Sequence, residues 1–154
     1  MKGNESIIKA LNEALANELG AIIQWRTHAE MFKFWGFSKL ANYELDIARD
    51  EEKHRDWLIA RILFLEGTPT VEPGPRLIGC DVIEMLKLDV RGEKTGIDTL
   101  VKGIKLAEEK CDFVTRDLFV KILQEETEDH TQWLETQLNL INLLGVENYL
   151  QAQM

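Results

Sequence analysis

Six side chains that can bind a metal ion interrupt the apolar faces of the helices that this sequence predicts. In each of four long segments, apolar residues recur at helical spacing, and a carboxylate stands near the middle of the apolar stripe. In two of these segments a histidine stands on the same stripe. The six residues are Glu18, Glu51, His54, Glu93, Glu126 and His130. A buried carboxylate without a partner is costly. Because all four helices place a carboxylate on their apolar face, we expect these carboxylates to share one bound partner.

The spacing of these residues favours metal ions as that ligand. Glu51 and His54 stand three residues apart, so a carboxylate oxygen and an imidazole nitrogen on one helix face can reach the same ion. Carboxylate-rich sites with one imidazole for each ion suit iron or manganese better than zinc. Two glutamates and two Glu-x-x-His pairs on four helices are a known di-iron arrangement. The alternative for any single glutamate is a buried ion pair or a place on the surface.

The elements that must position these side chains are four long helices. All three prolines fall between Pro69 and Pro75, so the strongest helix breaker is absent from the rest of the chain. Gly36 and Gly145 supply helix ends, and Ser38 supplies an N-cap. We expect helices over about Glu5–Trp35, Ser38–Leu65, Asp81–Lys110 and Phe113–Leu144, followed by a short C-terminal helix.

The loop between the second and third helices decides the topology. Helices of about 30 residues are about 45 Å long, and an extended loop over Glu66–Cys80 spans at most about 50 Å. The loop can therefore cross the whole bundle, so that the second and third helices run parallel. We expect an all-α, ferritin-like four-helix bundle with this long crossover and a short fifth helix, as a single domain over residues 1–154.

Composition limits the class of protein and its partners. The chain has 154 residues, of which 45% are hydrophobic, so it can build one core but not two ordinary domains. A formal net charge of −9 disfavours nucleic acid and favours cations as partners. No apolar run is long enough to span a membrane, and Cys80 and Cys111 form no CxxC pair. We therefore expect a cytoplasmic protein with reduced thiols that binds no membrane.

The sequence resembles the bacterioferritins over essentially its whole length. The similar stretches are LANELGAI, FKFWGFSKL, DEEKHRDWLIARILFLEGTP, DFVTRD, HTQWLE and the ending NYLQAQM. The resemblance implies a hollow 24-subunit shell, a ferroxidase centre in each subunit, O2 or peroxide as oxidant and a ferric mineral inside. It also implies that Glu51 bridges two irons and that the other iron ligands include Glu18, His54, Glu93 and His130.

The fourth helix departs from the family pattern. Thr127 stands where the family has a glutamate three residues before its histidine, and the segment that follows the TRD stretch is one residue longer than in many members. The extra residue brings Glu126 onto the expected position, four residues before His130, and a π-bulge can absorb such an insertion. We predict Glu126 as the ligand, with Glu128 as the alternative. Loss of this ligand would instead leave a slower or one-iron site.

A second departure concerns haem. The family binds haem across a two-fold axis through a methionine two residues before the histidine of the second helix, and this chain has Glu52 there. Because a carboxylate is a poor substitute for an axial thioether, we expect no haem from this chain alone. The chain would suit the ferroxidase role in a homo-oligomer or in a shell mixed with a haem-binding subunit. A ferredoxin is a candidate partner for iron release.

Three other residues near the predicted centre carry weaker expectations. Trp25 stands where the family commonly has tyrosine, and we expect it to pack in the core. Asp46 and Asp50 are four residues apart on the second helix, and they are candidates for an inner-surface iron relay. The alternative for this pair is a solvated helix face.

Two other functions compete with iron oxidation. A di-iron peroxidase of the rubrerythrin type would usually carry a four-cysteine iron domain, which two cysteines do not form. A non-catalytic subunit that completes a mixed shell needs no intact centre, and Thr127 keeps this alternative open. The other ligand positions favour a ferroxidase that stores iron, in which two adjacent metals deliver two electrons to one oxidant.

Overall fold

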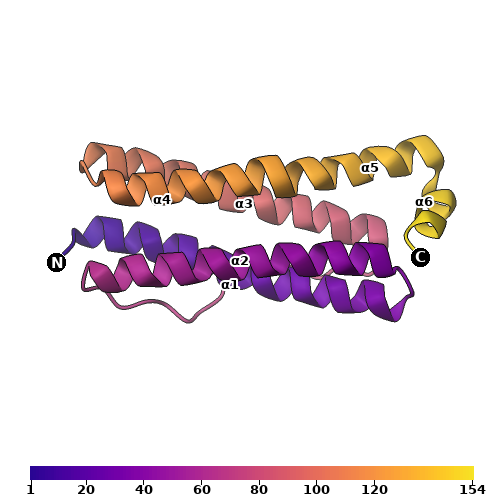
Figure 1. The fold of residues 1–154 in the computed structure, drawn as a ribbon, viewed down its shortest axis with the longest axis horizontal. Coiled ribbons are helices and arrows are strands. Elements are labelled where there is room, and N and C mark those ends of the chain that lie inside the picture. The colour runs from indigo at the N-terminus through magenta and orange to yellow at the C-terminus, as the bar shows by residue number, and fades with distance from the viewer.

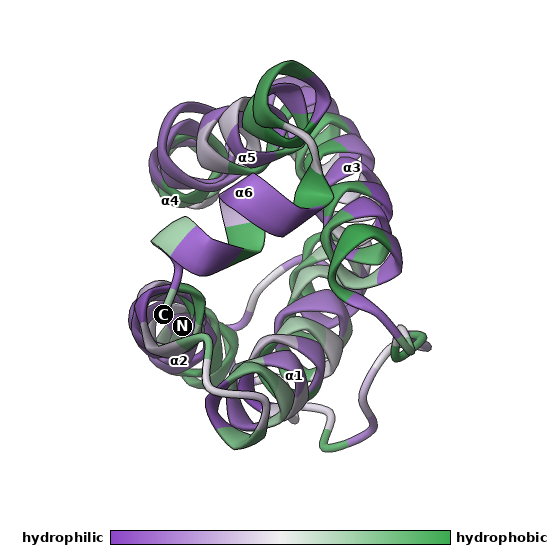
Figure 2. Cartoon of the chain, turned by 90° about the vertical axis from the view of Figure 1, so that its right-hand side faces the viewer, coloured by the Kyte–Doolittle hydropathy of each residue, from purple (hydrophilic) through white to green (hydrophobic).

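The computed structural model describes residues 1–154 as a four-helix bundle with a short helix across one end (Figures 1 and 2). Its first three long helices are α1 (Glu5–Phe34), α2 (Ser38–Phe64) and α3 (Val82–Glu109). The fourth consists of α4 (Phe113–Gln124), the π-helical segment η1 (Glu125–Thr131) and α5 (Gln132–Leu144), and α6 (Val146–Ala152) follows. The predicted all-α, ferritin-like fold is confirmed, and each helix end lies within one residue of the expected position. No helix has the length and apolarity of a membrane span.

Local signals in the sequence explain most of the helix ends. The predicted N-cap at Ser38 is wrong, because Ser38 is the first residue of α2 and no side chain caps that helix. The side chains of Asn4, Asp81 and Asp112 cap α1, α3 and α4 by accepting hydrogen bonds from backbone N–H groups in the first turn. Gly36 and Gly145 follow α1 and α5 with φ angles of 88° and 79°. These angles favour glycine, and an added Cβ at either position would meet nothing within 4 Å. Backbone conformation, and not space, therefore requires glycine at both ends.

The crossover loop from α2 to α3 lies against the middle of α1. The backbone N–H of Gly74 donates to the carbonyl of Ala16 at 2.7 Å, and a Cβ on Gly20 would overlap the carbonyl of Gly74. The loop returns the chain along the bundle, so that α2 and α3 run parallel (Figure 1). This path also brings Arg76 from the loop to the centre of the bundle, where its guanidinium donates to Gln24 and Asn17, each at 2.9 Å.

The core consists of two apolar clusters, one toward each end of the bundle. One cluster includes Trp25, Leu86 and Tyr149 and lies toward α6, and the other includes Leu58 and Phe119 and lies toward the opposite end. Most of the predicted apolar stripe residues are buried or half-buried. Leu144, the last residue of α5, lies on the predicted apolar stripe of the fourth helix and is an exception, since it is 48% exposed. The middle of the bundle lies between these clusters, and polar residues occupy it.

The π-helical segment η1 confirms the predicted π-bulge in the fourth helix. A π turn holds one more residue than an α turn, so the helix axis continues past the inserted residue. Threonine hydroxyls satisfy carbonyls in and before this segment: Thr127 Oγ1 donates to Leu123 at 2.8 Å, and Thr131 Oγ1 donates to Glu126 at 2.9 Å. The insertion is therefore accommodated inside one continuous helix.

Deletion of Thr127 should convert η1 into regular α-helix and stabilise the metal-free protein. The extra residue would be gone, and ordinary i to i−4 hydrogen bonds would replace the wide turn. We expect the unfolding temperature to rise by about 2–4 °C, equivalent to about 1 kcal/mol, in differential scanning calorimetry. Deletion of Thr136 from the regular helix α5 is the control and should lower it. A lower unfolding temperature after deletion of Thr127 would contradict this account of η1.

Candidate metal centre

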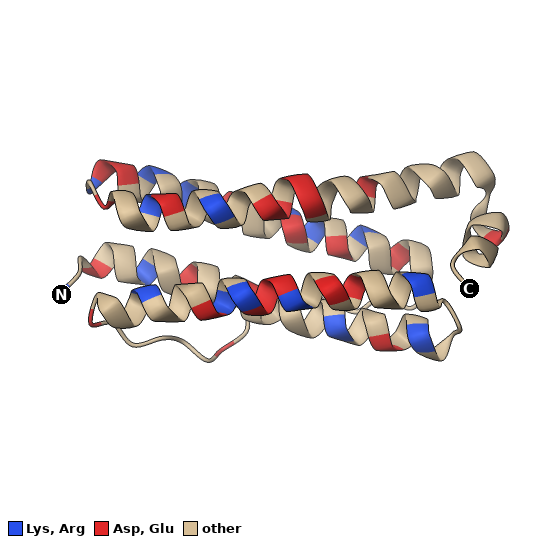
Figure 3. Cartoon of the chain, viewed as in Figure 1, with Lys and Arg blue, Asp and Glu red and all other residues tan.

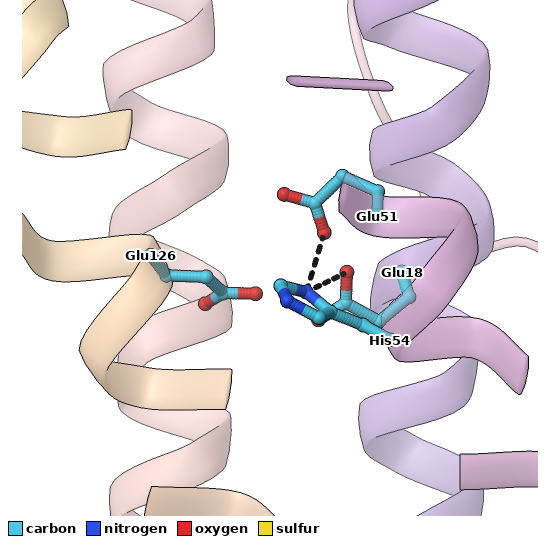
Figure 4. Close-up of side chains that lie close together, drawn as sticks. All are labelled: Glu18, Glu51, His54 and Glu126. Carbon is cyan, nitrogen blue, oxygen red and sulfur yellow. Dashed lines mark ion pairs between the residues drawn. The ribbon is translucent and has the colours of Figure 1, made fainter. Parts of the chain in front are cut away.

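All six side chains predicted to bind metal lie buried together at the middle of the bundle. None is more than 2% exposed. Acidic residues gather at mid-length on the helices in Figure 3. Two overlapping groups have ligand atoms within 4.8 Å of one another: Glu18, Glu51, His54 and Glu126 in the first, and Glu51, Glu93 and His130 in the second. Figure 4 shows Glu126 facing the first three across the bundle. The sequence therefore identified the residues that meet here.

Glu51 lies between the two histidines. Its Oε2 atom is 3.5 Å from Nδ1 of His54, and its Oε1 atom is 3.0 Å from Nδ1 of His130. His54 Nδ1 also lies 3.7 Å from Glu18, and His130 Nδ1 lies 3.5 Å from Glu93. Both histidines thus point Nδ1 into the cluster, and Glu51 offers one oxygen to each side. This arrangement suits a carboxylate that bridges two ions.

A carboxylate stands behind each histidine, on the side away from the cluster. Nε2 of His54 contacts Glu125, and Nε2 of His130 lies 3.4 Å from Oδ2 of Asp50. A carboxylate at Nε2 favours a proton on that nitrogen and leaves the Nδ1 lone pair free for a metal. Sequence reasoning did not single out Glu125, because it is one of three neighbouring glutamates on η1 and periodicity alone does not separate them.

Many buried polar atoms of the cluster have no hydrogen-bond partner within the protein. Ten buried side-chain atoms lack a hydrogen-bond partner, and seven of them belong to the six predicted residues. They include Nδ1 of both histidines and both oxygens of Glu51. Native proteins rarely leave buried polar atoms unsatisfied. Four carboxylates and two imidazoles are a donor set that fits two iron or manganese ions, which would satisfy these atoms.

The π-helical segment brings Glu126, and not Glu128, into the cluster. Glu126 is 1% exposed, whereas Glu128 lies on the surface with Gln124. A Cβ on Gly96 of α3 would stand 3.0 Å from Oε2 of Glu126, so the glycine leaves room for this carboxylate. Thr127 turns its hydroxyl to the helix backbone. The role of Glu126 as a ligand stays a prediction, and this geometry supports it.

Opposite charges set the protonation of Glu51 and His130. Burial alone would raise the pKa of Glu51, but contacts from His130 and His54 lower that pKa to about 2. Burial alone would lower the pKa of His130, but contacts with Asp50, Glu51 and Glu93 raise that pKa to about 12. Without metal, His130 is therefore protonated beside the ionised carboxylates of Glu51 and Asp50. A metal ion must displace this proton to reach Nδ1.

Burial has the opposite effect on the other two carboxyl groups. It raises the pKa of Glu126 well above its usual range, with further contributions from the charges of Glu93 and Glu51. Burial and then the charge of Glu51 also raise the pKa of Glu93. Contacts with His130 and then the charge of Arg76 oppose the shift of Glu93 in part, and the charge of Arg76 opposes that of Glu126. These carboxyl groups thus retain protons where an exposed glutamate has lost them.

The two predicted relay residues differ in their relation to the centre. Asp50 contacts His130 and lines a cavity of about 500 Å³ together with Asp46, Tyr43 and Asp129. Asp46 is not in the cluster, since its carboxylate is 71% exposed and pairs with Arg49 at 3.0 Å. The cavity also reaches His130. It is therefore an acidic depression beside the cluster, with Asp50 between the depression and the centre.

Two other expectations concern Trp25 and the cysteines. Trp25 is fully buried, and its Nε1–H donates to Oε1 of Glu93 at 3.3 Å, so it packs in the core and also orients a predicted ligand. Cys80 and Cys111 are exposed and form no disulfide. Sequence reasoning missed a separate buried group of His28, Glu44 and Asp89. The only sequence signal for it was a third histidine on α1.

Comparisons with known proteins agree with this geometry. A family model described as a ferritin-like domain matches residues 8–144. The chain is 43% identical to the bacterial ferritin of Neisseria meningitidis serogroup B over 157 aligned residues, with 100% of both chains covered. It is 44% identical to the bacterial ferritin of Pseudomonas aeruginosa, with 99% of both covered. It is 38% identical to the bacterioferritin of Brucella melitensis, over 97% of this chain and 92% of the relative.

Metal binding should become weaker as the pH falls. Zn(II), used as a redox-inert probe, must displace protons from His130 and from the carboxyl groups of Glu93 and Glu126, whose pKa values are raised. We expect calorimetric titrations to give lower affinity at about pH 6 than at about pH 8, with net proton release. Glu126→Gln should release fewer protons than the wild type. An affinity independent of pH over this range would refute this protonation scheme.

Glu125 is not a proposed metal ligand, but loss of its carboxylate behind His54 should weaken metal binding. Glu125→Ala takes away the group that holds the proton on Nε2 of His54. We expect the affinity for Co(II), followed by its visible absorption, to fall by about 10–100-fold. Glu128→Ala, on the exposed side of the same segment, is the matched control and should leave the affinity unchanged. Equal affinities for the wild type and Glu125→Ala would rule out this role.

Proposed function

We propose that this chain, which belongs to the ferritin family, oxidises Fe(II) at the centre formed by its four long helices. The chain is a ferroxidase, and its function is iron storage and detoxification. The observation that carries the assignment of the centre is the set of seven buried, unpartnered atoms that converge there. The proposed ligands are Glu18, Glu51, His54, Glu93, Glu126 and His130.

Fe(II) is the substrate, and the acidic depression beside the centre is its proposed entry or exit route. A concave, negatively charged surface raises the local concentration of cations. Asp50 lies at the edge of this depression and contacts His130. Movement of His130 would open a path between the depression and the centre. The exposed Asp46 would hold ions only at the outer part of this route.

The geometry divides the ligands into two sets that share one carboxylate. Glu18, His54 and Glu126 would hold one Fe(II), Glu93 and His130 would hold the other, and Glu51 would lie between them. Trp25 and the carboxylates behind the histidines keep the ligands in place. The four carboxylates balance the charge of two Fe(II) ions, and their hard oxygens favour Fe(III) as it forms. The protein thus promotes oxidation by positioning two reductants together.

The reaction needs two electrons for each oxidant molecule. Two Fe(II) ions lose one electron each, and one O2 takes up both electrons and two protons to give hydrogen peroxide. With peroxide as the oxidant, two electrons and two protons give two water molecules. A pair of adjacent irons matches this stoichiometry, whereas a single iron does not. Ferric product would then move to the interior of the protein shell.

The assembled protein is a multimeric cage. We propose a 24-subunit shell in the cytoplasm, built from this chain alone or together with a haem-binding subunit, with a ferredoxin as a candidate reductant for iron release. At the haem position, Glu52 pairs with Arg26, which supports our proposal that this chain offers no haem ligand. Because all four long helices contribute to both apolar clusters, we also propose that residues 1–154 act as one domain.

The competing function is a structural subunit without a working centre. The position of Glu126 is evidence against this function. That function would require the site to lack a ligand at Thr127. Instead, Glu126 is buried in the cluster with its Oε2 atom unpartnered. A di-iron peroxidase would use the same residues, and it would differ by a preference for peroxide over O2.

Aerobic Fe(II) oxidation by the metal-free protein tests the proposed function. After addition of two Fe(II) for each chain, we expect fast growth of ferric absorbance that saturates at this ratio. Glu126→Ala should slow the reaction by on the order of 100-fold, because one iron loses its position. Glu128→Ala is the control on the same helical segment and should react like the wild type.

Two results would change the proposal in different ways. Oxidation by the wild type no faster than in protein-free buffer would favour the structural subunit. Loss of oxidation in Glu128→Ala, together with full activity of Glu126→Ala, would assign the ligand to Glu128.

A further inference from the structure

A second buried polar cluster lies in the apolar end of the bundle nearest α6. His28 of α1, Glu44 of α2 and Asp89 of α3 are each 0% exposed, and their ligand atoms lie within 4.8 Å of one another. Asp89 stands one helical turn before Glu93, and Glu44 stands two turns before Glu51, so the cluster forms a separate layer. The three buried, unpartnered atoms outside the first centre all belong to this cluster.

His28 orients Asp89 and is not itself a metal ligand. The backbone N–H of Gly79 donates to Nε2 of His28 at 3.2 Å, so Nε2 carries a lone pair and the proton of the neutral ring is on Nδ1. Nδ1 then donates to Oδ1 of Asp89 at 2.8 Å. Both nitrogens are therefore used. The contact fixes one oxygen of Asp89 and leaves the other, Oδ2, without a partner.

Three oxygen atoms remain unsatisfied: both of Glu44 and Oδ2 of Asp89. Tyr149 does not serve them, because its hydroxyl donates to Gln137 at 2.8 Å. Arg76 acts on Asp89 only through its charge, since its hydrogen bonds go to Gln24 and Asn17. On the same two helices, Ile47 is one turn from Glu44, and Met85 and Leu86 are one turn from Asp89; all three belong to the apolar cluster toward α6. The carboxyl pair therefore needs a proton or a cation between its members.

A proton satisfies this pair only in part. Burial, the charge of Asp89 and a side-chain hydrogen bond with Asp89 raise the pKa of Glu44, so in the absence of metal one proton is held between the two carboxyl groups. That proton links one oxygen of Glu44 to Asp89, and it leaves the second oxygen of Glu44 unsatisfied and one negative charge buried. A divalent cation would contact all three oxygens and neutralise both carboxylates. A divalent cation therefore satisfies more oxygen atoms and neutralises more charge at this pair than one proton does.

We propose that Glu44 and Asp89 bind one hard divalent cation, such as Mn(II) or Fe(II), in a second site separate from the oxidation centre. Oxygen ligands within 4.8 Å of one another can both reach an ion at about 2.0–2.6 Å. His28 orients Asp89 through its hydrogen bond, and carboxylates that bind metal ions are usually hydrogen-bonded in this way. The ion would link α2, which packs mainly against α1, to α3, which packs mainly against α4. The proposal does not depend on iron oxidation.

Anomalous diffraction locates this ion directly. Crystals of the wild-type protein loaded with Mn(II), measured at the manganese absorption edge, should show a peak between Glu44 and Asp89. Glu44→Gln should remove this peak and lower the bound Mn(II) by one ion per chain in equilibrium dialysis, while peaks at Glu51 stay. Glu13→Gln, an exposed glutamate of α1, is the matched control and should change neither result.

The wild-type map decides the proposal even where a variant does not fold. A map with peaks beside Glu51 but none between Glu44 and Asp89 would overturn the second site and leave the oxidation centre in place. A peak only at the second site would support this inference and count against the first centre. Should Glu44→Gln fail to fold, Asp89→Asn replaces it, and a peak of unchanged height in that variant would overturn the assignment of Asp89 as a ligand.

Discussion

The cost of burying charged side chains at the centre of the bundle is the constraint on which the rest of the structure depends. Four carboxylates and two histidines lie where a bundle of this size would otherwise place apolar residues. Without metal, they are held by contacts among themselves, in which His130 and Glu51 take opposite charges. Seven of their atoms remain unpartnered. Under the proposed function, bound iron would satisfy these atoms, so binding of iron and stability of the fold would be linked.

Several features away from the ligands follow from this constraint. Gly96 leaves space for the side chain of Glu126, and the crossover loop brings a cation, Arg76, toward the carboxylates. The π-helical segment serves the same end, because it absorbs one inserted residue and still turns a glutamate inward. An α-helical path through the same sequence would rotate the following residues by about 100° per inserted residue. The wide turn therefore keeps a glutamate at the proposed ligand position although the linear spacing to His130 has changed.

The interior contains two polar layers with different chemistry. The central layer combines carboxylates with imidazoles whose Nδ1 atoms face inward, which suits ions that change oxidation state. The layer near α6 consists of a carboxylate pair, Glu44 and Asp89, in which the histidine is already hydrogen bonded at both nitrogens. Such a pair suits a cation that stays bound and joins helices. By our two proposals, one fold contains a site where iron is oxidised and a second site where a bound cation stabilises the fold.

The sequence by itself determined the helices, the crossover and the identity of the six central residues, because helical periodicity states which residues share a face. It also indicated that Glu126 could replace a ligand missing at Thr127. Only the tertiary structure separated Glu125 from Glu126, because the rotation within a π turn is set by packing against the other helices. Only the tertiary structure joined His28 to Asp89 and placed the loop residue Arg76, because contacts between distant elements leave no period in the chain.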